Sequence, residues 1–131
     1  MKTFVLDTSA LLRLYLPDGP LASLSEDALE LANQGDAIVS APELILAEVA
    51  QVLLKKERAK LITPEDASRI QKEIFALPIE LVKHKEIIEL AGELARTHHL
   101  SIYDGLFLAL ARKLRCTLIT CDDKLFKASK S

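Results

Sequence analysis

Four acidic side chains, Asp7, Glu48, Asp104 and Asp122, occupy positions from which carboxylates could act together. Asp7 follows an apolar run at residues 4–6, and Asp122 follows a similar strand-like segment near the end of the chain. Glu48 and Asp104 lie in early turns of predicted helices that leave the same strand ends. Because ligands of open α/β sheets bind in the crevice at the carboxyl ends of the strands, we expect the four carboxylates to converge there.

A cluster of four carboxylates implies a metal ion, because such groups could not all stay ionised at close range without a cation. Ligand sets made only of oxygen select hard ions, so we expect Mg²⁺ or Mn²⁺ rather than zinc. Such a centre suits phosphodiester hydrolysis. One or two ions can deprotonate a water, orient the scissile phosphate and stabilise the leaving oxygen.

Each of the four acids also has an ordinary structural explanation. Asp7 and Asp122 could cap the helices that follow them, as Asp often does. Asp104 would complete a capping box with the serine three residues before it. Glu48 lies about 60° from the centre of an apolar helical stripe, where it could reach solvent or pair with Lys55. Both explanations stay open for each residue taken alone.

The hydrophobic pattern predicts the parallel sheet that these acids need. The run at residues 4–6 is continuous rather than alternating, which is typical of a central strand covered on both faces. We expect strands at 4–6, 37–39, 79–82 and 117–120, and helices at 10–16, 21–34, 40–60, 63–76, 85–97 and 101–114. This alternation favours right-handed crossovers. It predicts an α/β fold of three layers, α/β/α, with a doubly wound parallel sheet of four strands, and a fifth only if the tail supplies it.

Three capping patterns mark expected helix starts. Ser40 is followed by a proline and then by an acid three residues on, which predicts a helix that begins there and runs to about Lys60. The same pattern begins at Thr63, and Ser101 with its following acid repeats it without the proline.

The 131 residues are expected to form one domain, residues 1–131, with half of them hydrophobic and 27% charged. No signal peptide or membrane-length apolar run is evident, so we expect a cytoplasmic protein with no membrane association. Cys116 and Cys121 are too few for a disulfide framework and are expected to be small buried hydrophobes.

The net charge of −2 is unevenly distributed, with −6 over residues 1–50 and +4 over residues 51–131. An acidic balance argues against a nucleic-acid partner. However, the chain is net positive once the four candidate ligands are set aside. Cations at helix C-termini are ordinary, but two basic clusters could also meet a phosphate backbone: Lys55, Lys56, Arg58 and Lys60, and Arg112, Lys113 and Arg115.

Other chemistries find less support. The chain has no phosphate-binding glycine loop, nucleophile elbow or paired-histidine zinc pattern. His98 and His99 stand where a helix is expected to end, which is a common place for histidine. A haloacid-dehalogenase-like phosphatase usually needs a second acid two residues after the first, and that position is Ser9.

The chain resembles the PIN domain family, and within it the VapC toxins of prokaryotic toxin–antitoxin pairs. The resemblance covers essentially the whole chain, with four motifs in family order: Leu6-Asp7-Thr8-Ser9, Pro42 with Glu48-Val49 and Leu53, Tyr103-Asp104, and Thr120-x-Asp122-x-x-Leu125. It implies that Asp7, Glu48, Asp104 and Asp122 are the metal-binding catalytic acids, with supporting hydroxyls from Thr8, Ser9 and Thr120.

The resemblance also implies an activity and partners. It implies a Mg²⁺- or Mn²⁺-dependent endoribonuclease that acts as a toxin on RNA, forms a homodimer and is inhibited by a cognate VapB-like antitoxin whose C-terminal segment covers the acidic site. Two features depart from the family. Gln51 stands where the family often has Asn, and the chain stops at Ser131, which leaves little room for a last edge strand. The alternative function is a non-cleaving PIN-like module that binds RNA or protein.

Overall fold

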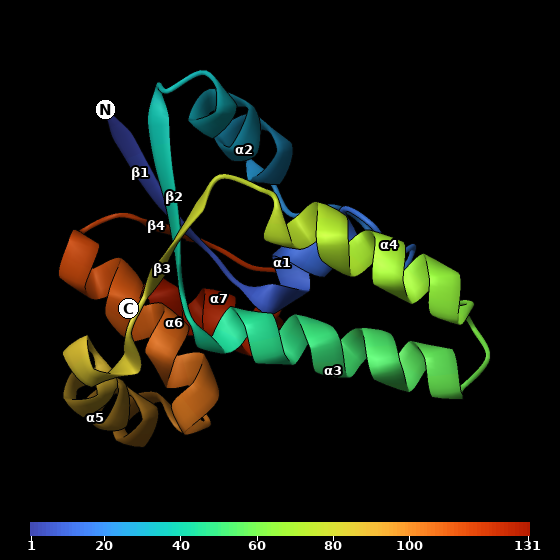
Figure 1. Ribbon diagram of the computed structural model, residues 1–131. Coiled ribbons are helices and arrows are strands. Elements are labelled where there is room, and N and C mark those ends of the chain that lie inside the picture. The colour runs from blue at the N-terminus through green and yellow to red at the C-terminus, as the bar shows by residue number, and fades with distance from the viewer.

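Four parallel strands form the centre of the computed structural model, which describes residues 1–131 (Figure 1). In chain order they are β1 (Lys2–Leu6), β2 (Ala37–Pro42), β3 (Ile79–Val82) and β4 (Thr117–Ile119). Their order across the sheet is β3-β2-β1-β4. The chain therefore moves from β1 toward β3 and then crosses to the other side of β1. The carboxyl end of β1 consequently lies at the switch point where doubly wound sheets bind ligands.

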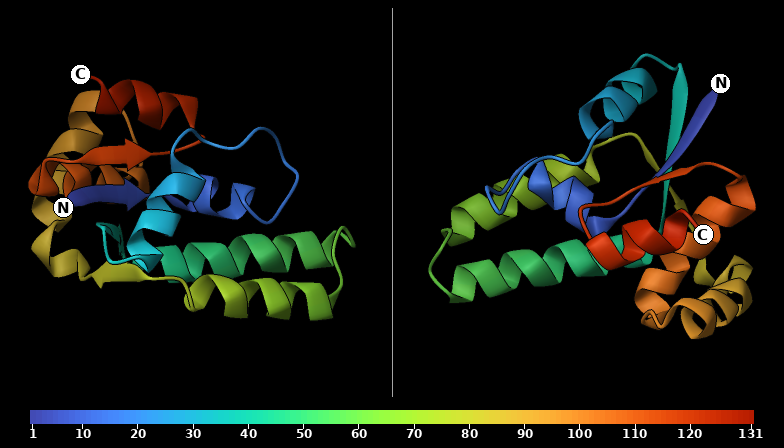
Figure 2. Two further views of the ribbon diagram at one scale, coloured as in Figure 1. Left: turned by 90° about the horizontal axis from the view of Figure 1, so that it is seen from above. Right: turned by 180° about the vertical axis from the view of Figure 1, so that it is seen from behind.

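Helices cover both faces of this sheet, which confirms the predicted three-layer fold. They are α1 (Thr8–Arg13), α2 (Ser25–Asn33), α3 (Leu44–Arg58), α4 (Pro64–Phe75), α5 (Ile88–His98), α6 (Ile102–Leu114) and α7 (Asp123–Ser129), with a 3₁₀ turn, η1, at His84–Glu86. In Figure 1, α5 and α6 lie on one side of the strands, with α1, α2 and α4 on the other. Near the C-terminus, α7 packs against β4 and α6 (Figure 2).

The core is deepest around β1 and α6. Phe4, Val5 and Leu6 are all buried, as the continuous apolar run predicted. Residues 105–111 of α6 are buried without a break, because this helix packs on β1 and β2 and is itself covered by α5. A helix that is enclosed on several sides needs apolar residues around most of its circumference.

The predicted helix start at Ser40 is wrong. Ser40 is 2% exposed and lies within β2, opposite Val5 of β1 and Glu80 of β3. Ala41 and Pro42 continue β2 and pair with Leu81 and Val82 of β3, so the residues after Ser40 cannot form the first turn of a helix. Pro42, which has no N–H to donate, ends the strand. The helix begins only at Leu44.

Smaller differences occur at other boundaries. The helices expected to start at residues 10, 21 and 85 start instead at Thr8, Ser25 and Ile88, the last one after η1. The residues after Asp122 form α7, so the tail supplies no fifth strand.

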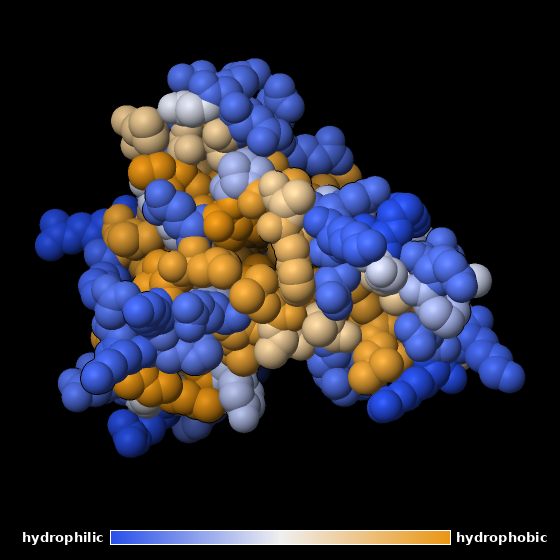
Figure 3. Space-filling model, in the orientation of Figure 1, coloured by the Kyte–Doolittle hydropathy of each residue, from blue (hydrophilic) through white to orange (hydrophobic).

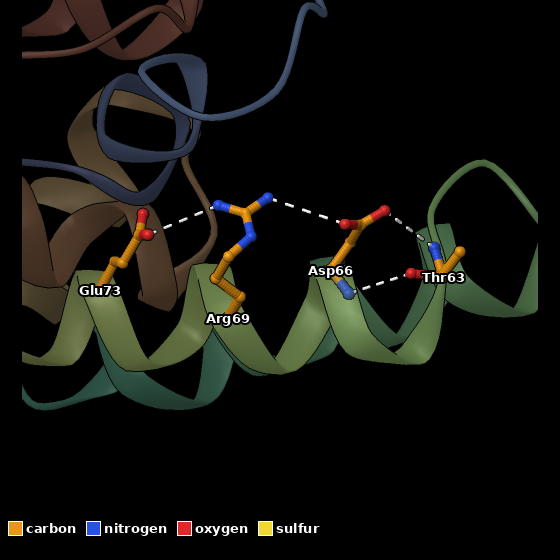
Figure 4. Close-up of polar contacts among 4 residues, drawn as sticks. All are labelled: Thr63, Asp66, Arg69 and Glu73. Atoms are coloured by element: carbon orange, nitrogen blue, oxygen red, sulfur yellow. Dashed lines mark hydrogen bonds and ion pairs between the residues drawn. The ribbon is translucent and has the colours of Figure 1, made fainter.

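The start of α4 follows the predicted capping box closely (Figure 4). The Thr63 hydroxyl accepts from the Asp66 N–H at 3.0 Å, and the Asp66 carboxylate accepts from the Thr63 N–H at 3.4 Å. Arg69 then lies between Asp66 and Glu73, at 3.7 and 3.5 Å. These ion pairs are exposed and contribute little. The helix is held on α3 mainly by its buried residues, Ala67, Ile70 and Ile74.

None of the helices combines the length and apolar character of a membrane-spanning segment.

Some hydrophobic residues are exposed on the surface. Figure 3 shows them gathered across the middle of one face, over the strands, with hydrophilic residues around them. Phe75 and Leu81 are 45% and 42% exposed, and both line a small, wholly hydrophobic cavity between α3, α4 and β3. We call the surface around Phe75 and Leu81 the apolar face.

Candidate active site

A cavity of about 560 Å³ lies at the carboxyl ends of the strands. All four predicted acids line it: Asp7 at the end of β1, Glu48 on α3, Asp104 on α6 and Asp122 before α7. We call it the acidic cavity. The structure thus brings together side chains that are up to 115 positions apart in the sequence.

Asp7 is the innermost of these acids, at 5% exposure, and is the one charged residue in the buried core. Its Oδ1 accepts from the Ala10 N–H at 2.9 Å and from the Ser9 hydroxyl at 2.8 Å. Its Oδ2 accepts from the Thr120 hydroxyl at 2.5 Å. Asp7 therefore caps α1 and faces the acidic cavity at the same time, so the two explanations of this residue are compatible.

Burial controls the ionisation of Asp7. It raises the pKa of this carboxyl from the ordinary value near 3.8 to about 6. The hydrogen bonds from Thr120, Ala10 and Ser9 stabilise the carboxylate and lower its pKa, while the negative charge of Asp122 raises it slightly. Desolvation outweighs three hydrogen bonds here because a charge in a nearly water-free position loses its hydration.

Glu48 is connected to the β1–α1 junction. The Thr8 hydroxyl donates to Glu48 Oε1 at 2.6 Å, so the partner of this carboxylate is Thr8 rather than Lys55. Burial raises the pKa of Glu48, the Thr8 hydrogen bond lowers it, and the charge of Asp104 raises it. Glu48 is half-buried at the edge of the α3 apolar stripe, as its helical phase predicted.

Asp104 and Asp122 complete the set. Asp104 lies in the first turn of α6, and its N–H donates to the Ser101 hydroxyl at 3.1 Å. Burial and then the charge of Asp122 raise the pKa of Asp104, against smaller opposite effects of Ser101 and Lys124. Asp122 caps α7, because its Oδ1 accepts from the Leu125 N–H at 2.8 Å.

The charge of a neighbouring acid opposes the ionisation of Asp7, Glu48 and Asp104. The charge of Asp122 raises the pKa of Asp7 and Asp104, and the charge of Asp104 raises that of Glu48. Such mutual repulsion is relieved by a bound cation. Four oxygen donors of this kind fit Mg²⁺ or Mn²⁺. In this structure, however, no three His, Cys, Asp or Glu side chains lie close enough together to enclose one ion.

The hydroxyls of Ser9 and Thr120 connect the ends of β1 and β4. Ser9 Oγ donates to Asp7, accepts from the Cys121 N–H at 3.0 Å, and lies 3.3 Å from Thr120 Oγ1. Thr120 Oγ1 accepts in turn from the Asp122 N–H at 2.9 Å. These contacts hold two acids of the cavity, Asp7 and Asp122, through one hydroxyl pair.

The basic clusters are only partly directed at the acidic cavity. Lys55 lines it, whereas Lys56 forms an ion pair with Asp18 at 2.6 Å. In the second cluster, Arg112 donates to the carbonyl oxygens of Ala128 and Ser131, at 3.3 and 2.9 Å. Lys56 and Arg112 therefore make contacts within the fold, and Lys55 is the one cation of the two clusters that lines the cavity with the acids.

Sequence reasoning missed two residues that position helices carrying acids of the cavity, one at the contact of α6 with α5 and one at the start of α3. A Cβ at Gly105 would lie 2.6 Å from the Ala91 carbonyl oxygen, so only glycine allows α6 to approach α5 this closely beside Asp104. A glycine in the first turn of an apolar helix was a signal for this contact. His84 accepts from the Leu44 N–H at 2.9 Å, and no local pattern indicates a contact across 40 residues.

The fold and the cavity define a doubly wound α/β protein with an acidic site at its switch point. Residues 4–131 match the family model of the PIN domain, and the chain belongs to this family. It is 31% identical to Ribonuclease VapC3 of Pyrobaculum aerophilum over 123 aligned residues. The alignment covers 92% of this chain and 90% of that protein. The family predicted from the four motifs is thereby confirmed.

Two solved structures share the fold. The crystal structure of PAE2754 from Pyrobaculum aerophilum aligns with a TM-score of 0.74 at 19% identity, over 98% of this chain and 87% of that one. The crystal structure of VapC20 from Mycobacterium tuberculosis, a sarcin-ricin loop cleaving toxin, aligns with a TM-score of 0.65 at 17% identity, over 95% and 94%.

Proposed function

We propose that this protein is a divalent-metal-dependent endoribonuclease that acts as the toxin of a toxin–antitoxin pair. The observation that carries the proposal is that Asp7, Glu48, Asp104 and Asp122 line one cavity at the switch point of the sheet. The similarity to Ribonuclease VapC3 supports RNA as the substrate. The fold shared with VapC20, which is named as a toxin, is consistent with the toxin role.

The four acids would hold Mg²⁺ or Mn²⁺. When bound, such an ion supplies an activated water and neutralises charge on the scissile phosphate. The chain itself orients the ligands. Thr120 and Ser9 hold the two oxygens of Asp7, while Thr8 holds one oxygen of Glu48 and leaves the other free. Groups fixed in this way need little reorganisation on binding.

Two further residues of the acidic cavity suit an RNA substrate. Lys55 makes no ion pair within the protein, so its ammonium group is free for a phosphate. Tyr103 is 56% exposed at the cavity, and an exposed aromatic ring can stack on an unpaired base. We propose that a VapB-like antitoxin inhibits the protein by covering this cavity, and that two copies form a homodimer.

The decisive experiment is RNA cleavage in Mg²⁺ by the antitoxin-free protein. Asp7→Asn and Asp104→Asn should each reduce the rate by about 100-fold or more, since metal-assisted charge stabilisation is worth several kcal/mol. Asp123→Asn is a matched control, because Asp123 is exposed and does not line the acidic cavity. Equal cleavage by all variants, or none by the wild type, contradicts the proposal.

One observation favours a second candidate, a PIN-like module that binds RNA or protein without cleaving it. No three acids are close enough in this structure to enclose an ion. Calorimetric titration with Mn²⁺ separates the two functions. The nuclease should bind the ion and lose this binding in Asp7→Asn, whereas a non-cleaving module should show no binding in either form.

A further inference from the structure

The start of α3 lacks the side-chain cap that most helices have. Glu43 occupies the cap position, but its backbone is already helical and its side chain accepts no hydrogen bond from the helix. The first N–H groups of a helix have no partner within the helix and need one from elsewhere. This end of α3 matters because Leu44, Glu48, Gln51 and Lys55 of α3 line one wall of the acidic cavity.

His84 supplies the missing partner from another part of the chain. Its Nε2 accepts from the Leu44 N–H at 2.9 Å. The preceding N–H, that of Glu43, donates to the Val82 carbonyl oxygen at 3.0 Å. Two consecutive N–H groups at the start of α3 are thus held by the segment that leaves β3. An accepting Nε2 requires a neutral imidazole ring with its proton on Nδ1.

We propose that His84 is a positioning residue for Glu48. Glu48 lies about 6 Å along the helix axis from Leu44, roughly one turn, so the placement of the first turn sets where the carboxylate enters the cavity. Apolar packing of Ile45 and Val49 holds α3 against the core but is not directional. The directional hydrogen bond from Leu44 to His84 fixes the rotation and axial position of the helix start.

This inference deepens the proposed function and rests on it in one respect, that Glu48 is a metal ligand. The His84 contact can also be tested without any metal. If His84 serves only as a general stabiliser, its removal should lower the melting temperature without changing the surroundings of Glu48. If it positions Glu48, the carboxylate must respond.

Three variants of the full chain form the test. His84→Ala removes the acceptor, and His84→Gln restores one, because its carboxamide oxygen can accept from Leu44. His98→Ala is the matched control, since His98 is a half-buried histidine whose side chain makes no hydrogen bond. The readouts are amide hydrogen exchange at Leu44, the ¹³C chemical shift of the Glu48 carboxylate in metal-free protein, and calorimetric Mn²⁺ binding.

In His84→Ala we expect exchange at Leu44 to be roughly 3- to 10-fold faster, as for loss of one hydrogen bond. We also expect a moved Glu48 signal and Mn²⁺ affinity that is lower by about 10-fold, as for loss of a group that orients a ligand. His84→Gln should return all three readouts toward the wild-type values, and His98→Ala should change none.

An unmoved Glu48 signal in His84→Ala overturns the inference, even if the melting temperature falls. A failure of His84→Gln to restore that signal overturns it as well. If the wild type binds no Mn²⁺, the proposed function fails instead. The Leu44 exchange rate and the Glu48 signal then still decide the role of His84.

Discussion

A single side chain, that of Asp7, carries both the fold and the candidate chemistry. As a cap it completes α1, and as a buried acid it lines the acidic cavity. Its three hydrogen bonds do not offset the loss of hydration, and its pKa is about 6. The ionised carboxylate of Asp7 is therefore destabilising in metal-free protein. A bound cation would offset this cost.

The raised pKa of Asp7 predicts how stability depends on pH. A folded-state pKa above the ordinary value near 3.8 means that the folded protein binds the proton more tightly than the unfolded chain does. In metal-free protein the stabilising contribution of Asp7 to the free energy of unfolding is fully present below pH 3.8 and is lost as the pH rises to about 6. The difference corresponds to about 3 kcal/mol.

Asp7→Asn should therefore raise the free energy of unfolding of metal-free protein at pH 7, by about 1–3 kcal/mol. It should also flatten the dependence between pH 4 and pH 6. Urea denaturation in EDTA at several pH values measures both effects. Asp123→Asn is the control, because Asp123 is exposed. A variant less stable than the wild type at pH 7 would show that capping of α1 outweighs desolvation.

Thr120→Val should raise the pKa of Asp7 further, because the Thr120 hydroxyl stabilises the carboxylate at 2.5 Å. The same change should lower stability by about 1–2 kcal/mol at pH 7, since Asp122 N–H also loses its acceptor. NMR titration of the Asp7 carboxylate measures the first effect. Thr117→Val, at an exposed position at the start of β4, should leave this pKa unchanged.

For single helices and strands, a local sequence pattern predicted the structure correctly where only local contacts determine it. The capping box at Thr63 forms as expected, because nothing in the fold competes with it. The similar pattern at Ser40 fails, because pairing with β1 and β3 holds that backbone in the sheet. A pattern of four residues cannot distinguish these cases, since the outcome depends on strands elsewhere in the chain.

The candidate site was likewise predictable from the sequence only in part. That Asp7 and Asp122 share one edge of the sheet was predictable, because the carboxyl ends of parallel strands lie together. The partner of Glu48 was not predictable, since it depends on how α3 lies against Thr8. The contact of His84 with Leu44 has no local signature for the same reason.

The close contact of α5 with α6 depends on Gly105. A Cβ at Gly105 would lie 2.6 Å from the Ala91 carbonyl oxygen, which is backbone and cannot rotate away. Gly105→Ala should therefore destabilise the protein by about 1–3 kcal/mol, despite the better helix propensity of alanine. Chemical denaturation measures this loss. Gly92→Ala on α5 is the control, since its nearest neighbour would be a flexible arginine at 3.6 Å and it should be neutral or stabilising.

At the scale of the whole molecule, the strand order explains why distant residues form one site. Placing β1 between β2 and β4 brings the ends of β1 and β4 together, so that Asp7 bonds to Thr120 across 113 positions. The same order leaves β3 at an edge of the sheet. Leu81 of β3 is exposed and lines the same hydrophobic cavity as Phe75. None of the four acids lines this cavity, so the apolar face is separate from the acidic cavity.

The apolar face predicts where the proposed homodimer would form. Exposed hydrophobic residues grouped on one face are typical of an interaction surface, and a second copy would bury Phe75 and Leu81. The wild type should sediment as a dimer, and Leu81→Lys should sediment as a monomer with unchanged circular dichroism, since a charge buried at an interface is costly. Leu61→Lys is the control, because Leu61 is 68% exposed and does not line the hydrophobic cavity that contains Phe75 and Leu81. A dimer that survives Leu81→Lys would place the interface elsewhere, and a monomeric wild type would contradict the homodimer itself.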